Sequence, residues 1–234
     1  MNSQYVLPIT IVVAGVLIAG AVFLVGKTSV PTPGGSTSGV TARPYDPAVD
    51  HILGNPDAPV KVVEYYDLEC LHCKTFQTTM HKVMEFYGAS GKVAWVSRHF
   101  PLASVHPKAP QEAQAAECAA DQGGNTAYFK FIDRVFEVTP SNNGLDLAQL
   151  PVIAKDVGLN VETFNACLSS NKFAKKVADS YTEAIKLGAQ GTPFTLVMVG
   201  NEAVTLNGNQ PYDSMRAAID AVLEGVSDTP ATTQ

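Results

Sequence analysis

The sequence predicts an α/β domain in which a helical block separates a strand–helix–strand unit from a final pair of strands and a closing helix. An N-terminal transmembrane helix is predicted in front of this domain. Three observations lead to this prediction: an uncharged apolar block near the N-terminus, short β-rich runs that begin near residues 60, 93 and 194, and helical periodicity through most of residues 105–188.

The composition limits the classes of function. The chain has 234 residues, a net charge of −6 and no run of Lys or Arg. A nucleic-acid-binding protein usually presents a basic face, so we expect no nucleic-acid partner. Four cysteines are too few for a disulfide-dense mini-protein, but they suffice for two pairs.

The block at residues 5–26 has no charged side chain. About 20 apolar residues of helix span the core of a bilayer, so we interpret this block as a membrane anchor behind a short flank at residues 1–4. A cleaved signal peptide is the alternative, because Ala19-Gly20-Ala21 resembles a small-residue cleavage site. The anchor is favoured because no Lys or Arg precedes the block and because the apolar run continues past Ala21.

Residues 27–50 are rich in Pro, Gly, Ser and Thr. Such a segment buries little apolar surface, so we predict a flexible linker here and a disordered tail at residues 227–234. The folded domain then occupies residues 51–226, with its helical block at about residues 105–188, and we expect a monomer.

The first half of the domain predicts a strand, a helix and a second strand. Val60–Tyr66 is a β-rich run that suits a buried strand. The segment Cys70-Leu71-His72-Cys73 opens a helical pattern that ends near Gly88, and a second strand follows at residues 93–97. The apolar positions of the helix recur at steps of three and four, namely Cys73, Phe76, Met80, Met84 and Tyr87.

The second half predicts helices and then a hairpin. Helices are expected at residues 108–121, 125–138, 147–158, 162–170 and 173–188. Pro151 is awkward inside the third of these helices and fits better at its start. Strands at residues 194–199 and 203–206 flank a Gly200-Asn201 turn, and a last helix is expected at residues 212–224.

A Cys-x-x-Cys motif at the start of a helix supplies what thiol–disulfide exchange needs. One acidic thiol attacks, and a second thiol resolves the mixed disulfide. The free N–H groups and the positive dipole end of the helix favour a thiolate at the first cysteine. We therefore assign Cys70 as the nucleophile and Cys73 as the resolving thiol, with His72 as a further donor beside the thiolate. An exposed, inactive His72 is the alternative.

Further motifs accompany the two cysteines. They are the stretch His51–Val60 that leads into the first strand, Phe100-Pro101-Leu102 followed by His106-Pro107, Cys118–Gly123 with Phe164–Leu168, and Gly191-Thr192-Pro193. Together with the Cys-x-x-Cys motif they resemble the DsbA-like branch of the thioredoxin superfamily over roughly residues 50–226. The resemblance implies a thioredoxin fold with the helical insertion between its βαβ and ββα halves.

The resemblance also implies roles for residues outside the motif. Pro193 would be a cis-proline that faces the cysteines, and Thr192 would offer its main chain to an extended substrate. A trans proline at a strand edge is the alternative. Glu64 would be a buried carboxylate that aids proton transfer at the resolving thiol, although a surface-facing glutamate fits the sequence equally well.

Cys118 and Cys167 would form a structural disulfide by the same resemblance, and such a disulfide implies an oxidising compartment. Two free buried thiols are the alternative.

The sequence does not decide whether the Cys70–Cys73 pair is oxidising or reducing. The resemblance to the DsbA-like branch implies that a histidine at the position of His72 goes with a low thiol pKa and an oxidising pair. Against this, Leu71 stands where many relatives have proline, and the acidic Asp67 and Glu69 oppose a thiolate at Cys70.

These implications lead to a membrane-anchored enzyme with its catalytic domain on the extracytoplasmic side. It would oxidise thiols of extended exported polypeptides and pass the electrons to a membrane-bound, quinone-linked partner, without a cofactor or a metal. A reductase or isomerase with the same site is one alternative. A metal-binding module that uses Cys70, His72 and Cys73 is another, although a structural zinc site needs a fourth ligand.

The remaining histidines, expected to be structural or exposed, are His51, His81, His99 and His106.

Overall fold

The computed structural model describes residues 41–227. Its centre is a five-stranded sheet with the strand order β1-β3-β2-β4-β5. The central strand β2 (Val60–Tyr66) is parallel to β3 (Val93–His99), and α2 (Leu71–Tyr87) connects them. This strand–helix–strand unit places the Cys-x-x-Cys motif where β2 ends and α2 begins, as predicted.

The other strands complete the sheet in antiparallel pairs. β1 (His51–Gly54) pairs with β3, and β4 (Phe194–Val199) pairs with β2 and with β5 (Glu202–Asn207). The turn between β4 and β5 contains Gly200, whose φ of +57° suits a two-residue hairpin turn. β1 was not predicted, because a run of four residues is too short to show a clear alternating pattern.

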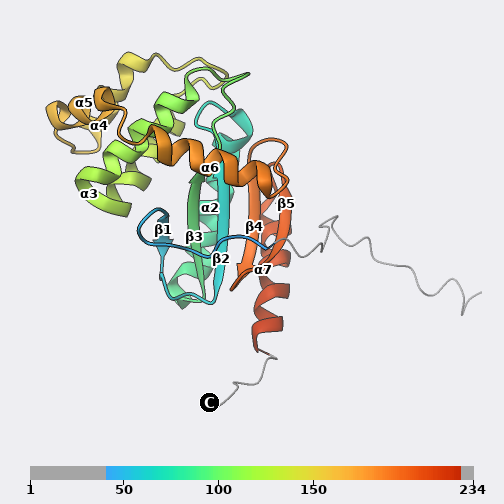
Figure 1. Ribbon diagram of the computed structural model, residues 1–234. Helices are drawn as coiled ribbons and strands as arrows, with labels where there is room; N and C mark the ends of the chain where they lie inside the picture. The colour runs from blue at the N-terminus through green and yellow to red at the C-terminus, as the bar shows by residue number, and fades with distance from the viewer. Residues whose placement is uncertain (1–40, 228–234) are drawn as a thin grey trace, which may run out of the picture. The chain divides into compact units, whose positions relative to one another are not determined.

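Helices cover both faces of the sheet. α2 and α7 (Tyr212–Ser227) pack on one face, and α6 (Ala174–Lys186) covers the other, crossing in front of the strands in Figure 1. Successive residues of a strand point to opposite faces. Glu64 and Tyr66 therefore point to the side of α2, whereas Tyr65 lies in the core under α6.

The helical insertion lies between β3 and β4 in the sequence. It consists of α3 (Ala109–Val138), α4 (Leu150–Asp156), α5 (Val161–Ser170) and α6, and the first three gather to one side of the sheet in Figure 1. A disulfide joins Cys118 on α3 to Cys167 on α5. The thioredoxin-like fold with a helical insertion is therefore confirmed.

Two details of the insertion follow from particular residues. The predicted break between residues 121 and 125 is a kink within α3, where Gly123 and Gly124 leave the helical conformation and Gly124 has a φ of +60°. Pro151 lies in the first turn of α4, because a short 3-10 helix, η2 (Leu147–Gln149), precedes it.

The structure corrects the predicted boundary of the linker. Composition predicts a flexible segment up to residue 50, yet the part of it that the structure describes is packed against the domain. Ala42 is buried, and Arg43 donates hydrogen bonds to Asp50 and Glu183. The folded domain therefore includes residues 42–50, because these ion pairs fix a segment that buries little apolar surface.

The remaining predictions for the termini fall outside the described residues. They concern the flank at residues 1–4, the transmembrane anchor at residues 5–26, the linker up to residue 40 and the tail beyond residue 227. Within residues 41–227, no helix is long and apolar enough to span a bilayer.

Candidate active site

Cys70 and Cys73 lie at the N-terminus of α2. Cys70 is the residue before the helix and has an extended backbone, whereas Cys73 lies one turn inside. Both are free thiols; 7% of Cys70 is exposed, and Cys73 is wholly buried in the core. A second molecule can therefore reach only the outer of the two sulfurs.

The surroundings of Cys70 favour its thiolate. The hydrogen bond from the Cys73 thiol contributes most, and backbone N–H groups of Cys73 and His72 add to it, so that the pKa of Cys70 is lowered to about 5 although burial opposes this. These N–H groups belong to the first helical turn, which has no intrahelical acceptors for them. His72 is an exposed residue, and its backbone N–H is the group that stabilises the thiolate of Cys70 by a hydrogen bond.

The inner thiol, Cys73, and a buried carboxyl group, Glu64, both have a raised pKa, in contrast to Cys70. Burial raises the pKa of Cys73 well above its ordinary value. Burial also raises the pKa of Glu64, on β2, to about 8 although the nearby indole of Trp95 acts in the opposite sense, and no donor in the described part of the chain is placed well enough to form a regular hydrogen bond with either carboxyl oxygen. The charge of Glu64 further raises the pKa of Cys73, so the two groups lie close together. A carboxyl group that can hold a proton near neutral pH thus accompanies the thiol that must gain or lose one.

The loop before β4 faces the nucleophile. The peptide bond between Thr192 and Pro193 is cis, and the Sγ atom of Cys70 lies 3.5 Å from the carbonyl oxygen of Thr192. This main-chain group comes from 122 residues further along the chain. The fold therefore brings the Gly-Thr-Pro motif and the Cys-x-x-Cys motif to one place.

Asp67 fixes the loop that leads to Cys70. Its Oδ1 atom accepts the backbone N–H of Glu69 at 2.8 Å, and its Oδ2 atom accepts the backbone N–H of Leu102 at 2.8 Å. The same Oδ2 atom lies 2.9 Å from Nδ1 of His106. The carboxylate expected from the sequence to disfavour the thiolate is therefore engaged by other groups, and the Phe-Pro-Leu and His-Pro motifs support the active-site loop.

A second polar cluster lies away from the cysteines. Glu117 on α3 is bonded to His51 at 3.0 Å, to His99 at 2.9 Å and to Lys176 at 2.5 Å. The two histidines lower the pKa of Glu117 although its burial acts in the opposite sense. His51 and His99 are both buried, which agrees with a structural role.

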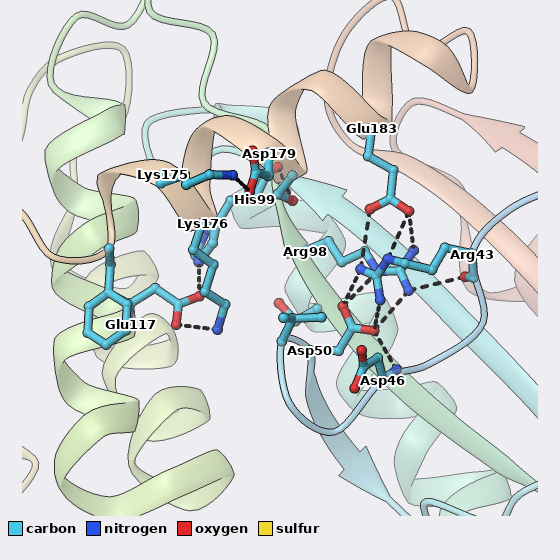
Figure 2. Close-up of a pocket in the computed structure, with 14 residues that line it drawn as sticks. Arg43, Asp46, Asp50, Arg98, His99, Glu117, Lys175, Lys176, Asp179 and Glu183 are labelled. Carbon is cyan, nitrogen blue, oxygen red and sulfur yellow. Dashed lines mark hydrogen bonds and ion pairs between the residues drawn. The ribbon is translucent and has the colours of Figure 1, made fainter.

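A pocket of about 660 Å³ opens beside this cluster, between the N-terminal segment, β3 and α6 (Figure 2). Most of its charged side chains are already paired, because Asp50 bonds Arg43 and Arg98 while Lys176 bonds Glu117. Neither active-site cysteine lines it. We therefore place the candidate active site at the start of α2 and not in this pocket.

In the part of the chain that the structure describes, no group of three or more His, Cys, Asp and Glu side chains is arranged to hold a metal ion.

Comparisons with known proteins assign the chain to a family. The family model described as Thioredoxin matches residues 47–221. The chain belongs to the thioredoxin family. One similar solved structure is that of DsbA2 from Pseudomonas aeruginosa, which is 25% identical with a TM-score of 0.63; the match covers 74% of this chain and 94% of that chain. Another is α-DsbA1 from Wolbachia pipientis, which is 28% identical with a TM-score of 0.67; the match covers 76% of this chain and 92% of that chain. BdbD from Bacillus subtilis, at 24% identity, a TM-score of 0.69 and coverage of 80% and 99%, shares the fold. Within the thioredoxin family this chain is a DsbA-like thiol–disulfide oxidoreductase.

A search of curated proteins finds relatives that are named as antiporters and not as oxidoreductases. A protein named Na(+)/H(+) antiporter NhaA 1 from Mycobacterium sp. (strain KMS) is 33% identical over 171 residues, which are 72% of this chain and 26% of the relative. Another, from Herminiimonas arsenicoxydans, is 32% identical over 186 residues, which are 80% and 28%. The thioredoxin-family chain thus spans about a quarter of the length of these relatives, and the likeness concerns only that part of them.

The structure gathers most of the residues that the sequence singles out. Cys70, Cys73 and Thr192 meet at the start of α2, and Glu64 lies beneath them, whereas the disulfide of the insertion lies between α3 and α5. Sequence reasoning missed the support that His106 gives to Asp67, and it missed Glu112. The position of Glu112 on the apolar face of its predicted helix is the signal that could have revealed a buried carboxyl group there.

Proposed function

We propose that the protein is an extracytoplasmic thiol oxidase that introduces disulfides into exported polypeptides through a mixed disulfide at Cys70. The observation that carries this proposal is the contrast between the two thiols: the pKa of Cys70 is about 5, while that of Cys73 is raised. Cys70 is therefore a thiolate at neutral pH, which stabilises the reduced form of the pair. A stabilised reduced form makes the corresponding disulfide a strong oxidant.

The oxidation proceeds in two exchanges. A substrate thiolate attacks the Sγ atom of Cys70 in the Cys70–Cys73 disulfide; the bond between the cysteines breaks, and Cys73 leaves with the electron pair and takes up a proton, which Glu64 can supply. The second substrate thiolate then attacks the substrate sulfur of the mixed disulfide and releases Cys70 as a thiolate. Two electrons pass from the substrate dithiol to the enzyme, and the substrate keeps the new disulfide.

An extended polypeptide fits the surface around Cys70. The carbonyl oxygen of Thr192 lies close to the reacting sulfur and can accept a main-chain N–H, and the adjacent Leu71 is 50% exposed. A peptide with an apolar residue beside its cysteine would pair with both features.

Two features support a location outside the cytoplasm. The disulfide between Cys118 and Cys167 is of a kind that persists in oxidising compartments. The apolar block at residues 5–26 is long enough to tether the domain to a membrane. We propose that a membrane-bound, quinone-linked protein reoxidises the pair and that the enzyme acts as a monomer.

The deciding experiment is a redox titration of the full chain in glutathione buffers, with thiol trapping to measure the Cys70–Cys73 disulfide. A potential between about −120 and −180 mV is expected for an oxidase. A potential near about −270 mV would instead assign the protein to reductases. Metal content is measured in parallel, and stoichiometric zinc without disulfide formation would contradict both redox functions.

A further inference from the structure

Two glutamates lie buried beside the active-site loop and have no part in the chemistry described above. Glu69 immediately precedes Cys70, and Glu112 lies in the first turn of α3. Both residues are 0% exposed. No donor in residues 41–227 is within hydrogen-bond distance of any of their four carboxyl oxygens. Burial of a carboxylate without a donor is strongly unfavourable, so this arrangement needs a proton.

The two carboxyl groups are each other's partner. Burial contributes most to the raised pKa of Glu112, and the hydrogen bond and charge of Glu69 come next, which together bring this pKa to about 9. Two carboxylates only accept hydrogen bonds, and they repel each other. When one of them carries a proton, it donates a short, charge-assisted hydrogen bond to the other.

Other charged groups lie near the pair, but none of them donates a hydrogen bond to its carboxyl oxygens. Asp67 adds a negative charge that favours protonation of Glu112, and it is itself bonded to His106. Lys108, one turn before Glu112 on α3, acts in the opposite sense. Lys74, on α2, donates a hydrogen bond to the backbone carbonyl oxygen of Thr139 and to neither carboxyl group of the pair.

The main chain on either side of the pair is held firmly. The backbone N–H of Glu69 donates to Asp67, and its carbonyl oxygen accepts the N–H of Asn142 at 2.8 Å. Lys108 binds the loop that contains Asn142 through the carbonyl oxygens of Asn143 and Leu145. The carboxyl pair thus lies where the insertion, this loop and the residue before the nucleophile meet.

We propose that Glu69 and Glu112 share one proton and act as a positioning pair that ties the helical insertion to the nucleophile Cys70. The inference deepens the proposed function and relies on it only for the identity of the nucleophile. The shared proton keeps the charge beside Cys70 at −1 instead of −2, and the hydrogen bond fixes the side chain next to the reacting sulfur. Loss of the proton leaves two buried carboxylates, which loosens the loop and disfavours the thiolate.

The first test measures the stability of the oxidised full chain against pH, because neither active-site cysteine titrates in that form. The sign follows from linkage: the unfolded chain releases this proton above about pH 4.5, whereas the native chain keeps it up to about pH 9. Stability from this group is therefore complete at low pH and is lost as the pH rises through that window. Between about pH 6 and 8, the ratio of folded to unfolded wild type should fall by about tenfold per pH unit relative to Glu112→Gln.

Glu85→Gln provides the matched control, since it removes the same charge from an exposed position on α2. It should leave the pH dependence of stability as it is in the wild type. Equal slopes for the wild type and Glu112→Gln would overturn the shared proton.

The second test measures positioning through the pH midpoint of Cys70 alkylation in the reduced protein. The amide of Glu112→Gln can still donate to Glu69, so its midpoint should match that of the wild type. Glu112→Ala leaves Glu69 without a donor, and its midpoint should rise by roughly half a pH unit or more. An unchanged midpoint in Glu112→Ala would overturn the positioning role. If Glu112→Ala does not fold, Glu112→Met replaces it: this side chain fills the space of the glutamate but cannot donate to Glu69, so the midpoint should again rise, and an unchanged midpoint would count against the proposal. A reductase-like potential would overturn the proposed function while leaving both tests valid.

Discussion

At the scale of single residues, the site is defined by which groups keep their protons. Cys70 loses its proton easily because the Cys73 thiol and the helix N–H groups stabilise the thiolate, whereas Cys73 and Glu64 retain theirs because they are buried. One turn of helix therefore separates two thiols of the same chemical type with very different acidity. This separation gives the attacking and resolving roles to different cysteines.

Removal of the resolving thiol should raise the pKa of the nucleophile. Cys73→Ala deletes the largest contribution to the low pKa of about 5 at Cys70. Because a hydrogen bond to a charged group is worth roughly 1.5–3 kcal/mol, the midpoint of iodoacetamide alkylation should rise by about 1–2 pH units. Cys73→Ser keeps an O–H donor and should keep most of the low pKa. A low midpoint in Cys73→Ala would show that the helix N–H groups suffice.

Neutralisation of Glu64 should slow the step in which Cys73 loses its proton. In Glu64→Gln, reaction of the reduced enzyme with oxidised glutathione should accumulate the Cys70–glutathione mixed disulfide, because its resolution slows by roughly 10²-fold. Mass spectrometry of acid-quenched samples measures this species. Resolution at the wild-type rate would exclude Glu64 from the proton transfer.

The same substitution should change how stability depends on pH. Burial raises the pKa of Glu64 from 4.5 to about 8, so its contribution is complete below the lower value and is lost as the pH rises towards the upper one. Glu64→Gln should therefore gain on the wild type by up to about 1.4 kcal/mol per pH unit within this window. Urea unfolding of the oxidised proteins at pH 5 and pH 8 measures the difference, and Glu85→Gln again serves as the control.

At the scale of the elements, the insertion is held together by a covalent bond and by a kink. The disulfide ties α3 to α5, and the Gly123-Gly124 kink redirects the second half of α3. The glycine pair was visible in the sequence as a break in the helical pattern. The pairing of the cysteines was expected from the family resemblance and not from their spacing, because their distance in space depends on how the helices pack.

Loss of this disulfide should destabilise the protein without changing its chemistry. The two cysteines are 49 residues apart, so the chain-entropy model gives a loss of about 4 kcal/mol for the double substitution Cys118→Ala/Cys167→Ala. Urea unfolding measures the loss, and Cys70 alkylation should keep its pH midpoint. A shifted midpoint would indicate that the insertion controls the nucleophile more closely than its distance in sequence suggests.

At the scale of the whole molecule, the N-terminal segment is part of the domain. Arg43 and Arg98 both bind Asp50, and Arg98 also reaches Glu183 on α6 (Figure 2). Arg98 is 3% exposed, so Asp50 neutralises a buried charge. The predicted order of strands and helices and the position of the active-site motif could be read from local periodicity. These ion pairs could not, because they join residues up to 140 positions apart whose types are common on any surface.

A chain that begins at residue 51 should be markedly less stable than one that begins at residue 41. The shorter chain lacks Asp50 and leaves Arg98 buried with fewer partners, which costs roughly 3–5 kcal/mol. Thermal and urea unfolding of the two chains measures this cost, and Asp50→Asn in the longer chain should reproduce most of it. Equal stability of the two chains would mean that the segment only rests on the surface.

The unequal burial of the two active-site thiols also offers a way to identify client proteins. Cys73 is the internal thiol that can attack Cys70 in a mixed disulfide and return the polypeptide as a free thiol, and the other two cysteines are closed in their own disulfide. A full chain with Cys73→Ala therefore has one reactive sulfur and no internal means of release. Once this chain is immobilised through a tag, its Cys70 thiolate would attack a disulfide of a client and release the client's other sulfur as a thiolate, and alkylation of that thiolate would keep the mixed disulfide in place. The proteins then eluted by a reductant would be those that exchange disulfides with this site.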